Sequence, residues 1–224
     1  MSVDFVTSSD PVAAATEALR GALRAVLDRD GRARIAVPGG SALAPFVAVA
    51  KLLPFELDRL CLTWVDERCV PHGHEDSNRG ALHRALGQEL PTELALYFDE
   101  ESPDQSVARV REGLHRVFDD ALDVTLLGMG ADGHVASLFV GHPTSPGERV
   151  RYVSDSPKPP ARRVTLTREV LATAPVSILL ATGEAKRGAL ERLRAGDPEL
   201  PASGLPGLTV FTDLDGFSGT QGAS

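Results

Sequence analysis

Residues 123–134 read DVTLLGMGADGH, and this stretch decides the class of fold. The run DVTLLG is short and apolar, which is typical of a strand buried on both faces of a parallel sheet. Directly after it comes the spacing G-x-G-x-x-G, which begins at Gly128 and is followed at once by His134. A glycine-rich turn at the end of a buried strand offers free backbone N–H groups to an anion. The stretch therefore predicts an α/β protein with a ligand site at this strand end.

Predicted strands and helices alternate on both sides of this stretch. One helix is expected to begin after Asp10, with Pro11 in its first turn, and another is expected over residues 103–118. The expected strands are residues 4–8, 33–37, 60–65, 94–98, 123–128, 149–154, 162–167, 175–182 and 208–214. This alternation predicts one domain over residues 1–224, with a doubly wound, mostly parallel sheet and helices on both faces. A polar, flexible tail is expected over residues 216–224.

Charge and length limit the possible partners. The 224 residues carry a net charge of -8, which argues against a general affinity for nucleic acid or an anionic membrane. The sequence has neither an apolar run long enough to span a membrane nor a signal peptide, so a cytoplasmic protein is expected. Cys61 and Cys69 are too few for a disulfide framework. An anionic ligand would therefore require a local basic pocket.

Polar loops follow four of the predicted strands. They are PGGS at 38–41, DERCVP at 66–71, GMGADGH at 128–134 and TGEAK at 182–186. Because the carboxyl ends of parallel strands meet at one edge of a sheet, these loops should lie close together. Their convergence predicts a ligand site at that edge more strongly than any single motif does.

The glycine loop has more than one interpretation. With Asp155 further on, its spacing satisfies the pattern of a dinucleotide-binding turn. However, the loop lies in mid-chain, the helix expected over HVASLF is short, and the segment after Asp155 is rich in proline. Alternatively, the loop amides bind an anion or oxyanion, Asp132 orders the turn, and His134 projects from a first helical turn as a neutral base. A capped turn with a solvent-exposed histidine would give the same pattern.

Phosphate-binding groups are expected in two other loops. The backbone N–H groups of Gly39 and Gly40 and the hydroxyl of Ser41 suit a phosphate, although an ordinary strand-to-helix turn also needs glycine. The loop lacks the lysine of a P-loop, which disfavours a nucleoside triphosphate. Lys186 is expected early in a helix, where a cation opposes the helix dipole and so indicates a ligand. Lys158, held between Pro157 and Pro159, could border the site or lie on the surface.

The loop at 66–78 carries charged and metal-binding residue types. Arg68 can bind a phosphate or a carboxylate and Asp66 can orient hydroxyl groups, although both could form a surface ion pair. The spacing C-x2-H-x-H at residues 69–74 raises the question of zinc. No second ligand pair with a recognised spacing accompanies it, so no metal site is expected.

The motifs taken together resemble the 6-phosphogluconolactonase family. They are PGGS, VDERCVPHGHEDSN, DVTLLGMGADGHVASLF with GHP after it, SPKPPARRVTLT and ATGEAKRGAL. The same superfamily contains the glucosamine-6-phosphate deaminases, whose histidine loop resembles DGHIAFNEP. The glutamate of that loop is missing from DGHVASLFVGHP here. The resemblance implies a Rossmann-like fold, a lactonase activity, and no metal or organic cofactor.

The resemblance also implies roles for the candidate residues in hydrolysing 6-phospho-D-glucono-1,5-lactone to 6-phosphogluconate in the oxidative pentose phosphate pathway. His134 would be the general base for water, and Asp132 would hold the loop and the imidazole tautomer. Arg68 would stabilise the oxyanion or anchor substrate oxygens. The remaining candidates are substrate-binding: Gly39, Gly40, Ser41, Arg163 and Lys186 for the phosphate, and Asp66 for sugar hydroxyls.

The implied partner is a small sugar-phosphate lactone, and the chain is expected to be a monomer or a small homo-oligomer. Two alternatives remain open from the sequence. One is an aminosugar-phosphate deaminase, which ammonia release would reveal. The other is a sugar-phosphate sensor without turnover, although this chain lacks the basic DNA-binding extension that such sensors usually carry.

Overall fold

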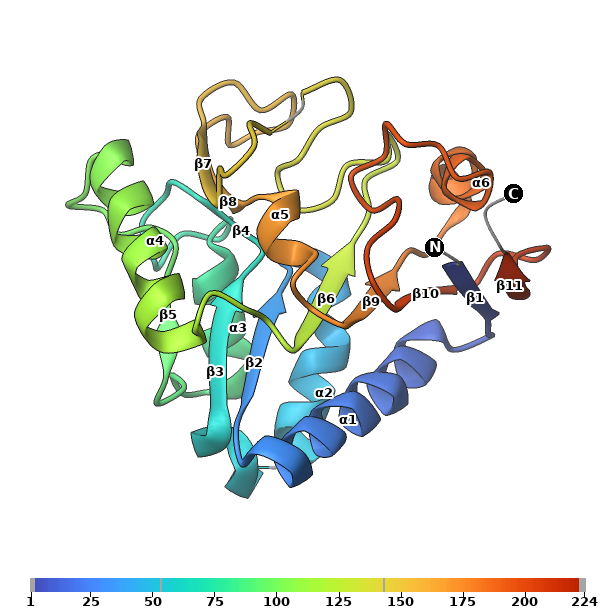
Figure 1. The fold of residues 1–224 in the computed structure, drawn as a ribbon, viewed down its shortest axis with the longest axis horizontal. Helices are drawn as coiled ribbons and strands as arrows, with labels where there is room; N and C mark the ends of the chain where they lie inside the picture. The colour runs from blue at the N-terminus through green and yellow to red at the C-terminus, as the bar shows by residue number, and fades with distance from the viewer. Residues whose placement is uncertain (1–2, 53, 143, 222–224) are drawn as a thin grey trace.

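The centre of the molecule is a sheet of eight strands in the order β11-β1-β10-β9-β6-β2-β3-β5 (Figure 1). In this computed structural model, residues 3–52, 54–142 and 144–221 are described. The parallel strands are β1 (Val3–Thr7), β2 (Ala33–Val37), β3 (Leu60–Trp64), β5 (Glu93–Leu94), β6 (Val124–Gly128), β9 (Val176–Leu180) and β10 (Leu208–Thr212). The prediction of an α/β fold with a mostly parallel sheet is confirmed.

The middle strands are continuous apolar runs because other layers cover both of their faces. In β6 the residues from Val124 to Leu127 are all buried, and its neighbour β9 is buried from Ser177 onward. The buried hydroxyls of Thr125 and Ser177 satisfy each other, with 3.1 Å between their oxygens. The hydroxyl pair therefore leaves no unsatisfied hydroxyl between these two strands.

Helices flank the sheet (Figure 1). They are α1 (Pro11–Asp30), α2 (Ala44–Leu52), α3 (Asn78–Leu86), α4 (Pro103–Phe118), α5 (Arg168–Leu171) and α6 (Arg187–Arg194), with short 3-10 turns η1 (Gly40–Leu43), η2 (Pro54–Arg59) and η3 (Glu184–Lys186). The Asp10 side chain caps α1 by accepting from the backbone N–H of Ala13 at 2.9 Å, as its sequence predicts. Helix α4 has the predicted bounds because Ser102 and Gln105 form a capping box at its start.

A second, three-stranded antiparallel sheet lies beside the first, and the sequence did not predict it. Its order is β4 (Asp66–Arg68), β8 (Arg163–Leu166) and β7 (Val150–Val153). The expectation that DERCVP is entirely loop is therefore wrong. Three polar residues carry no strand signal of their own, and they become a strand because they pair with distant β8, where Arg68 lies opposite Arg163. This pairing brings three candidate site residues together.

The helix expected after the glycine loop is not present, so the argument from a helix dipole at His134 is wrong. Residues 134–139 instead form a tight turn in which Val135 and Leu138 make an isolated β-bridge. Both of these side chains are buried, and Ala136 between them has a left-handed φ of 53°. The turn buries Val135 and Leu138, and this burial stabilises it over the helix that the sequence favours.

Two predictions at strand boundaries also need correction. The strand expected over residues 94–98 is only the two-residue β5, which pairs with the edge of β3. Part of the predicted tail is a strand, because β11 (Gly219–Gln221) pairs antiparallel with β1. Residues 222–224 of the predicted tail lie outside the described residues. A short polar segment acquires strand structure here because it adds to the exposed edge of β1.

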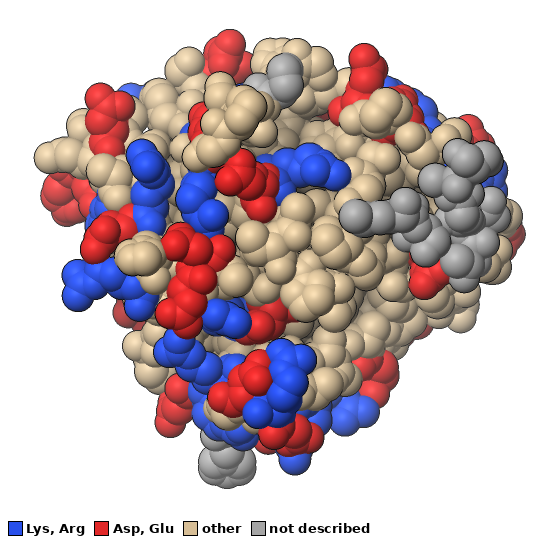
Figure 2. Space-filling model, viewed as in Figure 1, with Lys and Arg blue, Asp and Glu red and all other residues tan. Residues whose placement is uncertain are grey.

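Acidic and basic side chains are interspersed on the face shown in Figure 2, around a largely uncharged centre. This distribution agrees with a net charge of -8 that arises from 31 acidic and 23 basic residues. Among the helices that the structure describes, none combines the length and the apolar character needed to cross a membrane.

Candidate active site

A cleft of about 350 Å³ lies at the carboxyl ends of the parallel strands. The structure brings all four predicted loops to it. Its lining includes Gly39, Gly40 and Ser41 after β2, Asp66 and Arg68 on β4, Gly128, Gly130 and His134 around the end of β6, Lys186 after β9, and Lys158 and Arg163 from the β7–β8 hairpin. Of the nine sequence-predicted site residues, Asp132 alone is absent from this lining and instead contacts His134.

The glycine loop holds His134 against Asp132. The imidazole Nδ1 lies 2.5 Å from Asp132 Oδ1, and the ring centroid is 5.0 Å from that of Phe139. Two backbone hydrogen bonds of Gly130 close the turn. Its N–H donates to the carbonyl of His134, and its carbonyl accepts from the N–H of Gly133. A Cβ on Gly130 would lie 2.1 Å from His134 Nδ1, so this position requires glycine for the imidazole to fit. The loop therefore fixes the ring orientation.

Burial keeps His134 neutral. Its side chain is 14% exposed, and loss of hydration lowers the pKa of the imidazole, which the charge and hydrogen bond of Asp132 only partly oppose. Burial alone would raise the pKa of Asp132, but the hydrogen bond from His134 and the nearby charges make its net pKa lower than usual. An ionised Asp132 accepts the proton on Nδ1 and leaves Nε2 unprotonated. This geometry is that of an oriented base.

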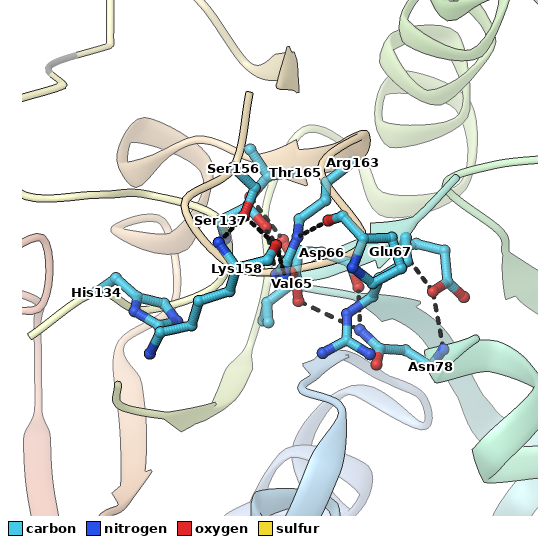
Figure 3. Close-up of polar contacts among 12 residues, drawn as sticks. Val65, Asp66, Glu67, Asn78, His134, Ser137, Ser156, Lys158, Arg163 and Thr165 are labelled. Atoms are coloured by element: carbon cyan, nitrogen blue, oxygen red, sulfur yellow. Dashed lines mark hydrogen bonds and ion pairs between the residues drawn. The ribbon is translucent and has the colours of Figure 1, made fainter. Parts of the chain in front are cut away.

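A buried polar network joins two residues of the cleft lining, Asp66 and Arg163, to their neighbours (Figure 3). Asp66 Oδ2 accepts from Ser137 Oγ at 2.6 Å and lies 3.5 Å from Nη1 of Arg163. The other nitrogens of Arg163 donate to backbone carbonyls, with Nε 3.0 Å from Pro160 O and Nη2 3.0 Å from Lys158 O. Arg163 therefore holds the 156–160 loop in place, and through it the position of Lys158.

Arg68 lines the cleft and is held by one hydrogen bond to the loop beside it. Its Nη1 donates to the carbonyl of Asp76 at 2.8 Å, while its buried Nε makes no hydrogen bond within the described part of the chain. Its remaining guanidinium N–H groups can donate to an oxygen atom bound in the cleft.

Sequence reasoning missed the residues that position Arg68 and Asp66. Glu67 accepts from the backbone N–H groups of Arg68, Asn78 and Arg79, and burial raises the pKa of its carboxyl. Asn78 Nδ2 donates to the carbonyl of Asp66 at 2.8 Å. Both residues belong to the DERCVPHGHEDSN motif, but their spacing alone carries no signal of this role. Only the packing of α3 against β4 reveals it.

Two lysines make part of the cleft wall basic. Lys186 lies at the start of α6, where burial and the charge of Lys158 lower the pKa of its amine. Lys158 Nζ is 3.7 Å from Asp132 Oδ1. Across the cleft, a Cβ on Gly39 would lie 1.8 Å from Asn78 Oδ1, so glycine allows this turn to pack against α3. The cleft is therefore a local basic pocket in an acidic protein.

The C-x2-H-x-H residues do not assemble into a metal site together. Cys69 is partly buried, and burial raises the pKa of its thiol to about 11. Among the described residues, His72 groups instead with His83 and Glu89, away from the lining of the cleft. His74 is exposed and accepts from the backbone N–H of Asp76.

A parallel α/β sheet with a polar cleft at its carboxyl edge defines the class of α/β proteins that bind small molecules at their strand ends. Within this class, residues 7–210 match the family of glucosamine-6-phosphate isomerases and 6-phosphogluconolactonase, and the chain belongs to this family. It is 34% identical to the 6-phosphogluconolactonase of Homo sapiens over 224 residues, which cover 93% of this chain and 86% of that protein.

Solved structures show the same fold. The crystal structure of 6-phosphogluconolactonase from Thermotoga maritima superposes with a TM-score of 0.83 at 24% identity, covering 94% of this chain and 97% of that one. A monomeric glucosamine-6-phosphate deaminase superposes with a TM-score of 0.77 at 17% identity, covering 95% and 97%. Because a lactonase and a deaminase share the fold, the residues of the cleft must distinguish the two activities.

Proposed function

We propose that this chain hydrolyses 6-phospho-D-glucono-1,5-lactone to 6-phosphogluconate, the lactonase step of the oxidative pentose phosphate pathway. The observation that carries the proposal is the neutral His134, held through Nδ1 by Asp132 at 2.5 Å with the imidazole lining a basic cleft. The identity with a 6-phosphogluconolactonase over most of the chain supports the choice of substrate. A base beside a binding site for anions is what hydrolysis of a phosphorylated ester requires.

In the proposed mechanism His134 Nε2 takes a proton from water as the water oxygen attacks C1 of the lactone. The carbonyl oxygen becomes an oxyanion, which the guanidinium of Arg68 at the cleft lining stabilises. The bond between C1 and the ring oxygen then breaks, and the imidazolium returns its proton to that oxygen. Asp132 stabilises the imidazolium during the intervening step. General base catalysis of this kind contributes about 10²–10⁴-fold to the rate.

The phosphate of the substrate would bind between the β2 turn and α6. Backbone N–H groups at Gly39 and Gly40, the hydroxyl of Ser41 and the amine of Lys186 supply donors and charge. Arg163 adds positive charge from its buried position in the cleft wall, although most of its N–H groups donate to the loop that it supports. Asp66 would orient sugar hydroxyls from its position on the cleft wall.

The proposal is tested by turnover of freshly prepared lactone, followed as loss of lactone above the spontaneous rate. Ammonia release from glucosamine 6-phosphate is measured in parallel, and it is not expected because the deaminase glutamate is missing from the DGHVASLF segment. Ammonia release without lactone turnover would assign the chain to the deaminases. Binding of a sugar phosphate without either reaction would indicate a sensor.

Replacing Lys186 with Ala tests the phosphate site separately. A hydrogen bond to a charged group contributes about 1.5–3 kcal/mol, so KM should rise roughly 10–100-fold while kcat changes less. Lys51→Ala is the matched control, because Lys51 is an exposed lysine at the end of α2 that does not line the cleft. An unchanged KM in Lys186→Ala would remove Lys186 from the phosphate site.

A further inference from the structure

Two histidines and a glutamate converge next to β5, outside the cleft. His72 Nε2 and His83 Nδ1 share a hydrogen bond of 2.9 Å, which a bound ion would replace, and His83 Nδ1 lies 3.7 Å from a carboxylate oxygen of Glu89. The three possible ligand atoms are all within 4.8 Å of one another. Ligands of a tetrahedral zinc ion stand about 2.1 Å from the metal and hence roughly 3.4 Å from each other. The two measured separations lie on either side of this value.

A carboxylate behind His83 gives the imidazole the orientation of a metal ligand. His83 Nε2 is 2.7 Å from Glu93 Oε1, and Glu93 is itself held by the backbone N–H of Leu90 and by Nε of Arg79. The side chains of His83 and Glu93 are 8% and 7% exposed, so this contact is buried. When Nε2–H donates to Glu93, the lone pair of Nδ1 points toward His72. Metal-binding histidines typically donate their second nitrogen to a carboxylate in this way.

The backbone around the cluster places His72 close to α3. The carbonyl oxygen of His72 would lie 2.1 Å from a Cβ on Gly80, so only glycine at this position lets the loop approach the helix so closely. The ring centroids of His72 and His83 are 5.0 Å apart. The loop and the helix thus present their imidazoles to one point.

Arginines close to the cluster have acidic or backbone partners. Arg79 pairs with Glu93 at 3.2 Å and with Glu89 at 3.7 Å, and Arg84 donates to the carbonyl of Glu75. The side chain of Glu89 is 65% exposed and can turn from Arg79 to a bound ion. A divalent ion would replace the 3.7 Å contact of Arg79 with Glu89. The contact of Arg79 with Glu93 would stay in place.

We propose that His72, His83 and Glu89 bind one divalent transition-metal ion of the zinc type, with water completing its coordination. Two imidazoles and a carboxylate are ligands that Zn²⁺ takes readily, whereas Mg²⁺ and Ca²⁺ prefer oxygen. None of the three residues lines the cleft, so the ion is not a participant in lactone hydrolysis. The ion would connect three segments: the loop of His72, helix α3 through His83, and the segment before β5 through Glu89. The same loop contains Asp76, whose carbonyl accepts a hydrogen bond from Arg68.

The test is zinc binding to the full chain, stripped of metal and free of any affinity tag, measured by calorimetry and by the visible spectrum of the cobalt-substituted protein. One ion per chain and the absorption of tetrahedral Co²⁺ are expected. Both His72→Ala and Glu89→Gln should weaken binding at least tenfold, and zinc should raise the melting temperature of the unmodified protein but not of these variants. His72 and Glu89 are exposed, so neither change should unfold the chain.

The matched control is His115→Ala, which removes an exposed histidine that contacts Asp120 on the other side of the α4 terminus. This variant should bind zinc as the unmodified protein does. The proposal would be overturned if the unmodified protein bound zinc no more tightly than His72→Ala does, or if His115→Ala weakened binding equally. The second result would mean that zinc binds weakly to surface histidines in general.

Discussion

Two histidine–aspartate pairs in this protein have nearly the same contact, but the pKa values of their histidines are shifted in opposite directions. In the glycine loop, Nδ1 of His134 is 2.5 Å from Asp132, and at the end of α4, Nδ1 of His115 is 2.8 Å from Asp120. The side chain of His134 is 14% exposed and that of His115 is 71% exposed. The pKa of His134 is lowered by burial, whereas the pKa of His115 is raised by its hydrogen bond with Asp120.

The comparison shows that a carboxylate partner alone does not determine the charge of a histidine. At His115 solvent hydrates the imidazolium, and the last turn of a helix favours a cation. At His134 the imidazolium would lose hydration, and Lys158 adds a like charge that lowers the pKa further. A neutral imidazole with an aspartate behind it can act as a base, and a lowered pKa keeps the imidazole neutral over a wider pH range than a raised pKa does.

The largest expected effect is the difference in kcat between variants of the two histidines. His134→Ala removes the proposed base, so kcat for lactone hydrolysis should fall about 10²–10⁴-fold. His115→Ala changes an exposed pair and should leave kcat unchanged. Initial rates on fresh lactone, corrected for spontaneous hydrolysis, measure both. Full activity in His134→Ala would show that another group activates water.

Removing the charge of each aspartate should have a smaller effect on kcat than removing His134. Again only the pair in the glycine loop should be affected. In Asp132→Asn the hydrogen bond to a charged acceptor becomes a neutral one, which supports the imidazolium by about 1–1.5 kcal/mol less, so kcat should fall roughly tenfold. The pKa of His134 should fall further, because Asp132 raises it. Asp120→Asn is the control and should lower the pKa of His115 without changing the rate. Equal rates in both aspartate variants would contradict an assisting role for Asp132.

The pH dependence of the two histidines should have opposite signs. The pKa of His134 in the folded protein lies below 6.5, so as pH falls the imidazole takes up a proton in the unfolded chain before it does so in the folded one. The folded state therefore loses stability as pH falls below 6.5. The folded pKa of His115 lies above 6.5, so its stabilisation is present below 6.5 and is lost as pH rises through the folded value. Catalysis should persist below pH 6.5 and fall only as His134 becomes protonated.

Proton NMR titration of the two imidazoles, with His134→Ala and His115→Ala for assignment, measures both values directly. The rate of lactone hydrolysis over the same pH range should follow the His134 titration. If His134 titrated above 6.5, burial would not be the dominant influence on its pKa and the comparison between the two pairs would fail.

The smallest expected effect concerns Lys158. Its amine is 3.7 Å from Asp132, and its charge lowers the pKa of His134. Lys158→Ala should therefore raise the pKa of His134 slightly, and only slightly because the Lys158 side chain is 47% exposed and well hydrated. Lys51→Ala should cause no shift. A lower pKa in Lys158→Ala would show that the variant changes the burial of His134 instead of its electrostatics.

Local patterns in the sequence determined the class of fold and much of the location of the site. Helix α4 was predictable to its bounds because its apolar face and the capping box at its start lie within 17 residues of chain, from Ser102 to Phe118. The meeting of four strand-end loops followed from the rule that parallel strands end at one edge. His134, Lys186 and the β2 glycines were therefore found near one another, as the lining of the cleft shows.

Tertiary structure alone decided how these residues are held and charged. The strand character of Asp66–Arg68 depends on pairing with β8, which lies about a hundred residues away in the chain. The pKa of His134 is lowered by burial and not by a helix dipole, because the expected helix is absent. The cluster of His72, His83 and Glu89 likewise forms only when a loop packs against α3. Hydration, strand pairing and side-chain convergence depend on atoms that are distant in sequence, and no local pattern records them.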